Sequence, residues 1–400
     1  MKPQESFEEK IDLYLLYFLE KNYQKMQKKT ILLLFTCLII SHLQAQKLSP
    51  KPQILKALTS ANDYFMNEWS DVSKPIWAAD RTRPSNIWTR GVYYEGLMAL
   101  YKVDKQKRYY DYAVSWGEAH KWGLRNGTKT RNGDDQCCGQ TYMDLYLIDP
   151  KPERIKDIKA CIDNMVNSEK KDDWTWIDAL QMAMPVFAQL GVIYKDDRYF
   201  EKMYEMYMLT KNVEGAKGLY NPVEKLWYRD KDFDPPYTTP AGKSCYWSRG
   251  DGWVVAALVR VLDIMPKNAP HRAEYEKTFL EMMKVLPAYQ RTDGFWNVSI
   301  TDETDFGGKE LTGTALFTYG MAWGVNKGLL KKKIYAPIIA KAMNAMMKDC
   351  VHPNGFLGYV QGTGKEPKDG QPLSYDKVPN FDDFGVGCFL LAGAEVYKMK

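Results

Sequence analysis

Apolar residues recur at helical spacing in seven segments of the chain, and strand-like alternation of apolar and polar residues is sparse. Stretches rich in Gly, Pro, Asn and Asp separate these segments and indicate loops. With the weaker patterns included, the chain predicts about ten to twelve helices. The seven segments are 91–101, 178–190, 253–264, 275–289, 314–330, 334–347 and 386–397.

The helices are expected to form pairs joined by one short and one long loop, which is typical of an all-α toroid of helical hairpins. A solenoid of TPR type would need a repeat of about 34 residues, and none is found. No low-complexity linker interrupts residues 46–400, so we predict one domain there. In such a toroid the long loops gather at one end, where we expect the functional site.

The N-terminal segment has the pattern of a secretory signal. Two lysines precede the apolar run 31–40, and the small residue Ala45 follows it. The run is too short to span a bilayer. We expect residues 1–45 to be an extension plus a signal peptide, with Met26 as the true start and cleavage near Ala45. This predicts a periplasmic or secreted protein without a membrane anchor; a short N-terminal anchor helix remains the alternative.

Composition limits the kinds of partner and cofactor that we expect for this protein. The 55 basic and 50 acidic residues give a net charge of +5, too balanced for a protein that coats nucleic acid. Aromatic residues make up 14 %, with 12 Trp and 27 Tyr, which fits a sugar-binding cleft or a large aromatic core. The three histidines after residue 45 are scattered, and no phosphate-binding loop occurs, so we expect no metal and no cofactor. The six cysteines there permit disulfides, but their spacing assigns none.

Carboxylates stand at two places where loops enter helices. Asp178 begins an apolar segment and follows Trp174 and Trp176. It either caps that helix or acts as a general acid whose pKa a neighbouring indole raises. Asp134 and Asp135 precede another predicted helix, and carboxylates from separate helix entries can form an acid/base couple.

A glycine-rich loop, Trp247-Ser248-Arg249-Gly250-Asp251-Gly252-Trp253, supplies candidate binding residues. Arg249 can bind a carboxylate with two parallel hydrogen bonds, or it can be buried and hold loop carbonyls. Trp253 and Trp247 can stack on a sugar ring. A further aromatic loop carries Arg229 after Trp227-Tyr228.

Four segments, taken in order along the chain, together resemble glycoside hydrolase family 105. They are the WTWIDAL segment at 174–180, the WSRGDGW loop at 247–253, the segment 311–330 and the closing segment 383–398. The members of this family are unsaturated rhamnogalacturonyl and glucuronyl hydrolases. The resemblance spans most of the chain after Trp88 and implies an (α/α)6 barrel that acts on oligosaccharides ending in an unsaturated uronate. We also expect the protein to be a monomer.

The resemblance also implies a mechanism. Protonation at C4 of the Δ4,5-unsaturated uronate and addition of water at C5 give a hemiketal whose opening breaks the glycosidic bond. Asp178 matches the general acid/base, and Asp135 or Asp134 matches the second carboxylate, with Asp135 favoured here. Arg249 and Trp253 match binding residues, although Asp251 stands where the family usually has Asn.

Arg229 departs from the family pattern, in which a His often follows the aromatic pair. An Arg there favours an additional anion, so we expect either a sulfated substrate of ulvan type or pectic rhamnogalacturonan. Two alternatives stay open. One is a non-catalytic oligosaccharide-binding protein, which has no need of Asp178. The other is an α/α-barrel glycosidase or epimerase that acts on saturated sugars.

Overall fold

The segments with the broadest apolar faces form the inner wall of a helical barrel. Nearly every residue of α12 (Leu311–Asn326) and α14 (Asp383–Lys398) is buried, whereas α7 (Glu153–Val166) buries one stripe. A helix that is apolar all round has to be covered by others, and an amphipathic helix provides that cover. The computed structural model describes residues 47–78, 81–378 and 383–400.

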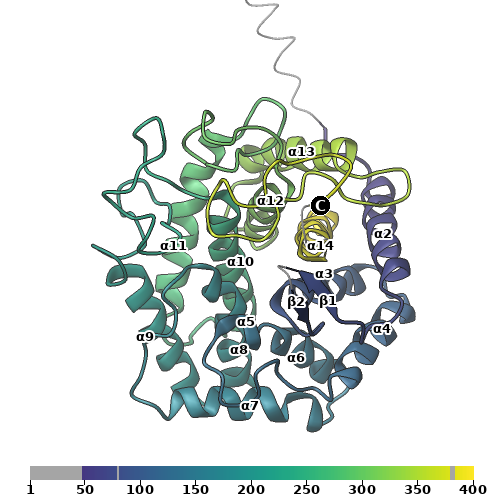
Figure 1. Cartoon of the computed structure of the whole chain (residues 1–400), viewed down its shortest axis with the longest axis vertical. Helices are drawn as coiled ribbons and strands as arrows, with labels where there is room; N and C mark the ends of the chain where they lie inside the picture. The colour runs from purple at the N-terminus through teal and green to yellow at the C-terminus, as the bar shows by residue number, and fades with distance from the viewer. Residues whose placement is uncertain (1–46, 79–80, 379–382) are drawn as a thin grey trace, which may run out of the picture. The chain divides into compact units, whose positions relative to one another are not determined.

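The inner helices close into a ring in which each contacts the next, and α14 returns to α3 (Figure 1). Each is followed or preceded in the chain by an outer helix that packs on its outer side. The described residues therefore confirm the all-α (α/α)6 barrel. The remaining inner helices are α3 (Trp88–Val103), α6 (Cys138–Ile148), α8 (Asp178–Tyr194) and α10 (Ser248–Ile264). The remaining outer helices are α2 (Lys51–Glu68), α4 (Lys107–Ala119), α9 (Arg198–Asn212), α11 (Arg272–Val285) and α13 (Lys332–Asp349).

The inner helices all begin at the same end of the barrel. Thr89 in the first turn of α3 donates a hydrogen bond to Asp383, the first residue of α14, over 3.0 Å. Gly313 in α12 lies against Ser248 of α10 so closely that a Cβ added there would be 2.6 Å from the serine Oγ. Long loops precede these first turns, as the toroid predicts.

Two features differ from the sequence expectation. Strands β1 (Ile76–Ala78) and β2 (Arg81–Arg83) form an antiparallel hairpin that was not predicted, since three-residue strands show no detectable alternation. Four inner helices, α3, α10, α12 and α14, also begin about one turn before their apolar periodicity, as at Trp88 rather than Gly91, whereas α8 begins at Asp178 as predicted. Those first turns are polar or glycine-rich.

The other elements are α5 (Gly133–Gln136) and the 3₁₀ helix η1 (Leu286–Tyr289). Residues 47–400 make one compact unit, and the six cysteines in it are buried and free. In the described part of the chain no helix is both long and apolar enough to cross a membrane. The predicted signal peptide, with Met26 and Ala45, lies outside the described residues.

Candidate active site

Asp178 lies at the mouth of the barrel, where it is paired with Arg229. The loop carrying Trp176 runs beside the loop carrying Arg229, and the backbone N–H of Ile177 donates a hydrogen bond to the Arg229 carbonyl over 3.0 Å. Arg229 Nε then donates to Asp178 Oδ2 over 3.1 Å, and its Nη1 donates to Asp230 Oδ2 over 2.5 Å. Burial alone would lower the pKa of Arg229, but the two carboxylates raise it above its ordinary value. Arg229 therefore holds Asp178 in place.

Asp134, in the short helix α5, lies near enough to Asp178 to feel its charge. Its backbone N–H is capped by the Asn132 side chain over 2.8 Å, which fixes the start of that helix. Its carboxyl group has no hydrogen-bond or ion-pair partner in the described part of the chain. Burial and then the negative charge of Asp178 raise the pKa of Asp134 to about 6. Asp134 can thus exchange a proton in mildly acidic solution, near pH 6.

Asp135 points away from this pair into a closed polar cluster. It is fully buried, and it accepts hydrogen bonds from Arg125 Nε at 2.6 Å, Asn126 Nδ2 at 2.8 Å and Thr130 Oγ1 at 2.6 Å. All of these partners belong to the loop before α5. The geometry consequently favours Asp134 over Asp135 as the second carboxylate and gives Asp135 the task of shaping the loop.

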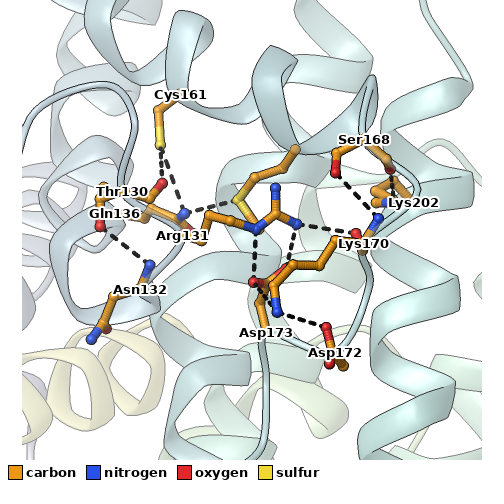
Figure 2. Close-up of polar contacts among 11 residues, drawn as sticks. Thr130, Arg131, Asn132, Gln136, Cys161, Ser168, Lys170, Asp172, Asp173 and Lys202 are labelled. Carbon is orange, nitrogen blue, oxygen red and sulfur yellow. Dashed lines mark hydrogen bonds and ion pairs between the residues drawn. The ribbon is translucent and has the colours of Figure 1, made fainter.

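Arg131 and Asp173 join the two loops that carry the facing carboxylates (Figure 2). Arg131 Nε donates to Asp173 Oδ1 over 2.8 Å, and its Nη2 also reaches the Lys170 carbonyl over 3.0 Å. Asp173 is almost fully buried, with 4 % of its side chain exposed. A bidentate Arg–carboxylate pair has fixed geometry as well as energy, so it ties the loop before Asp134 to the loop before Asp178.

Arg249 is committed to the backbone of another loop. Its Nη1 donates to the Gln361 carbonyl over 2.6 Å and its Nη2 to the Gly362 carbonyl over 2.7 Å. The side chain is fully buried, and burial lowers the pKa to about 10. Trp247 supports the same loop by donating to Gln361 Oε1 over 2.8 Å. Of the two roles open to Arg249 from the sequence, the structure shows the one that holds loop carbonyls.

Some of the predicted tryptophans are buried in the protein, and others are partly exposed at the site. Trp253 and Trp174 are buried, and Trp174 packs edge-on against Phe187. Trp176 is half-buried next to Asp178. Trp88, which the sequence did not single out as a site residue, is also half-buried and packs edge-on against Trp253 with ring centroids 6.2 Å apart. Trp88, which lines the cleft, and Trp176, which adjoins Asp178, are therefore indoles that a sugar can reach.

Asp251 links the glycine-rich helix start to the aromatic loop. Its Oδ1 accepts the backbone N–H of Trp227 over 2.9 Å, and the side chain is fully buried. Burial raises the pKa of Asp251 well above its ordinary value. A protonated carboxyl group has one acceptor and one donor, as an Asn side chain has, which explains how Asp can stand here.

A cleft of about 550 Å³ opens beside Asp134. Its walls come from the β1–β2 hairpin, the start of α3 and the loop before α5. Within the described ranges, no group of three or more His, Cys, Asp or Glu side chains is placed to hold a metal ion. The residues at hand can bind a sugar and exchange protons with it. The lining residues are Arg81, Thr82, Arg83, Pro84, Trp88, Arg125, Asn126 and Asp134.

Comparison with known proteins gives a consistent result. The model of Glycosyl Hydrolase Family 88 matches residues 58–400. An unsaturated 3S-rhamnoglycuronyl hydrolase of Formosa agariphila is 29 % identical over 395 residues, which cover 94 % of this chain and all of the relative.

Solved structures agree with the family match. A family 88 glycosyl hydrolase of Bacteroides vulgatus is 31 % identical, covers 88 % of this chain and 99 % of its own, and superposes with a TM-score of 0.78. A structure described as a polysaccharide lyase is 30 % identical with the same TM-score, over 88 % and 98 % of the two chains.

Proposed function

Because the chain belongs to glycosyl hydrolase family 88 and is a glycoside hydrolase, we propose that it removes a terminal Δ4,5-unsaturated uronic acid from products of polysaccharide lyases. The observation that carries this proposal is a pair of neighbouring carboxylates: Asp134 lines a cleft sized for sugars, and Asp178 lies near enough to raise its pKa. Two neighbouring carboxyl groups can supply both the proton donor and the proton acceptor that this reaction needs.

The chemistry needs one proton at C4 and one hydroxyl at C5. A carboxylic acid gives its proton to C4 of the enol ether, and water adds its oxygen to C5 while a carboxylate takes the second proton. The hemiketal formed in this way opens to a ketone and releases the neighbouring sugar. Proton transfers therefore balance within the carboxylate pair and one water molecule.

We assign the proton exchange with the substrate to Asp178 and the supporting role to Asp134. Asp178 occupies the first position of an inner helix, beside Trp176, and the family resemblance implies this role. Asp134 can take up a proton in mildly acidic solution, and the charge of Asp178 raises its pKa. Arg229 positions Asp178, and the Arg131–Asp173 pair keeps the two carboxylates at a fixed spacing.

For the substrate we propose an unsaturated uronate linked to a 3-sulfated rhamnose, the unit found in ulvan. Two relatives bear the name unsaturated 3S-rhamnoglycuronyl hydrolase, from Formosa agariphila and from an Alteromonas species, the latter 27 % identical over 341 residues. Pectic rhamnogalacturonan is the competing substrate. The signal-like N-terminus supports an exported protein, periplasmic or secreted, and we propose that it works as a monomer.

The C4=C5 bond absorbs in the ultraviolet, so its disappearance reports the reaction. We would add the protein to lyase digests of ulvan and of rhamnogalacturonan, with Asp178→Asn as the inactive variant. Asp172→Asn is the matched control, because Asp172 sits in the same loop with its side chain 66 % exposed. Loss of absorbance with the wild type and the control, but not with Asp178→Asn, supports the proposal. A folded wild type that leaves both digests unchanged contradicts it.

The structural relative described as a lyase makes lyase activity the second candidate. A lyase creates the C4=C5 bond, so the same absorbance would rise when intact polymer is supplied. The sign of the absorbance change on polymer and on digest separates the two activities.

A further inference from the structure

Glu95, in the inner helix α3, is a fully buried carboxyl group that is held from two sides. Its Oε1 accepts a hydrogen bond from the Cys137 thiol, with 3.3 Å between oxygen and sulfur. Its Oε2 accepts a second hydrogen bond from Gln181 Nε2 over 2.7 Å. The two donors belong to different elements, since Cys137 joins α5 to α6 and Gln181 lies in α8. One side chain of α3 therefore links the two elements that carry the carboxylates of the site.

Both donors lie one helical turn below a carboxylate of the site. Gln181 follows Asp178 by three residues in α8, so the two side chains share a face of that helix. Cys137 follows Asp134 by three residues and keeps helical backbone angles, with φ −54° and ψ −42°. Three residues of helix correspond to about 4.5 Å along the axis. Glu95 thus bridges the turns directly beneath Asp134 and Asp178.

Close packing around the bridge leaves little room for movement. Gly91, one turn before Glu95 on α3, is so near to Cys137 that an added Cβ would lie 2.9 Å from the sulfur. At the start of α5, a Cβ added to Gly133 would lie 3.3 Å from the carbonyl oxygen of Ala179 in α8. Closely packed interiors transmit a displacement instead of absorbing it. A change at Glu95 should therefore reach the first turns of α5 and α8.

The protonation states of the bridge suit hydrogen bonding. Burial raises the pKa of Glu95 to about 7, although the charge of Arg260 opposes the rise. Burial and then the charge of Glu95 raise the pKa of Cys137 well above its ordinary value, so the thiol stays protonated and remains a donor. Gln181 Oε1 has no hydrogen-bond partner among the described residues.

A glutamine in place of Glu95 can keep both contacts. Because Glu95 carries a proton about half of the time at pH 7, a neutral side chain reproduces one of its native forms. The new amide oxygen would accept from Cys137, and the new amide nitrogen would donate to Gln181 Oε1 once the Gln181 amide turns over. Leucine has a similar size and can form neither hydrogen bond.

We propose that Glu95 is a positioning residue that fixes the separation of Asp134 and Asp178 from below. Among the described residues, those that line the cleft beside Asp134 do not include Glu95, so it acts through Cys137 and Gln181 instead of on the sugar. The inference rests on the proposed function, since it explains how the acid/base pair is held at its working distance. A glutamate that only stabilises the fold is the competing interpretation.

Kinetics of Glu95→Leu and Glu95→Gln on an unsaturated disaccharide test this role. Glu95→Leu should lower kcat at least about tenfold and change KM by less than about twofold, because small displacements of reacting groups slow the chemical step. Glu95→Gln should keep kcat within about threefold of the wild type, because it restores the bridge without the charge. Glu395→Leu is the matched control, since Glu395 is a nearly buried glutamate of α14 that also accepts from a side-chain amide, that of Asn326, over 2.8 Å.

Variants that remove one arm of the bridge cover the case in which Glu95→Leu does not fold. Cys137→Ala and Gln181→Met each leave the other contact, and each should lower kcat about threefold with the fold intact by circular dichroism. Wild-type kcat in Glu95→Leu, or in both one-arm variants, overturns the positioning role. So does an equal loss of kcat in Glu95→Leu and Glu95→Gln, or in Glu95→Leu and Glu395→Leu.

A stability cycle separates this inference from the proposed activity. Asp134→Asn removes a carboxyl group whose pKa burial and Asp178 raise, so it should increase Tm at pH 8. That increase should fall by about half in the Glu95→Leu background, where the pair can move apart, and persist in the Glu95→Gln background. These melts need no substrate, so this result stands even if no uronate is released, in which case the proposed function fails alone. An undiminished increase in the Glu95→Leu background overturns the positioning role whatever the activity.

Discussion

The charged form of Asp134 should destabilise the folded protein. Replacing Asp134 by Asn should therefore make the protein more stable, while activity is lost. The ordinary pKa of an aspartate is 3.8, and in the native site that of Asp134 is about 6. Between these values the native state binds more protons than the unfolded state. The free energy of unfolding therefore falls as the pH rises from about 4 to about 6, and the cost remains in full above that range.

The pKa difference sets the size of this effect. At about 1.4 kcal/mol for each pH unit, the charged form of Asp134 costs the native state up to roughly 3 kcal/mol at pH 8. With an unfolding entropy of about 2.1 cal/mol/K per residue over the folded unit 47–400, this corresponds to about 4 °C in Tm. Asn has nearly the same shape and no charge, and Asp134 forms no ion pair in the described chain that the change would break.

Calorimetry of the wild type, Asp134→Asn and Asp135→Asn at pH 8 and pH 4 measures the effect. We expect Asp134→Asn to melt about 4 °C higher at pH 8 and at the same temperature as the wild type at pH 4. The neighbouring change Asp135→Asn should lower Tm at pH 8, because it weakens charged hydrogen bonds from Arg125, Asn126 and Thr130. A Tm of Asp134→Asn at or below that of the wild type at pH 8, or a gain that persists at pH 4, would refute the reasoning.

Three further outcomes follow from the contacts at the site. Arg229→Ala should reduce kcat on sulfated and unsulfated substrates by the same factor, at least tenfold, because it releases Asp178; a loss confined to sulfated substrate would mean direct anion binding. Asp251→Asn should keep activity and should raise Tm above neutral pH, because Asp251 is a buried acid with a raised pKa. Asp251→Ala should lower the free energy of unfolding, measured by denaturant titration, by about 1–3 kcal/mol. Arg131→Ala should lower kcat about tenfold with the fold intact by circular dichroism, and an unchanged kcat would show that the link to Asp173 does not set the spacing.

The helical fold could be predicted because its signal is periodic and long. Segments such as 386–397 are apolar on every side, which is what an inner barrel helix requires. The helix starts came out about one turn late because the first turns of α3, α10 and α14 are polar or rich in glycine. These turns face the mouth of the barrel and its loops. The part of each helix that periodicity misses is therefore the part nearest the site.

The sequence could not identify the second carboxylate, for a geometric reason. Neighbouring residues on a helix point about 100° apart, so only one of Asp134 and Asp135 faces Asp178. A helix as short as α5 has no periodicity from which to tell them apart. Arg249 presents the same difficulty, because its partners Gln361 and Gly362 follow more than a hundred residues later and only the closed barrel brings them together.

The shared direction of the inner helices has an electrostatic consequence. Peptide dipoles add along a helix and leave about half a positive charge at its N-terminus. Six such ends meet around the mouth and together amount to about three positive charges, which offset acidic residues in their first turns, including Asp178, Asp251 and Asp383. The helix ends therefore favour the approach of an anionic oligosaccharide to the mouth. This steering acts on encounter rather than on chemistry, so added salt should lower kcat/KM and leave kcat unchanged.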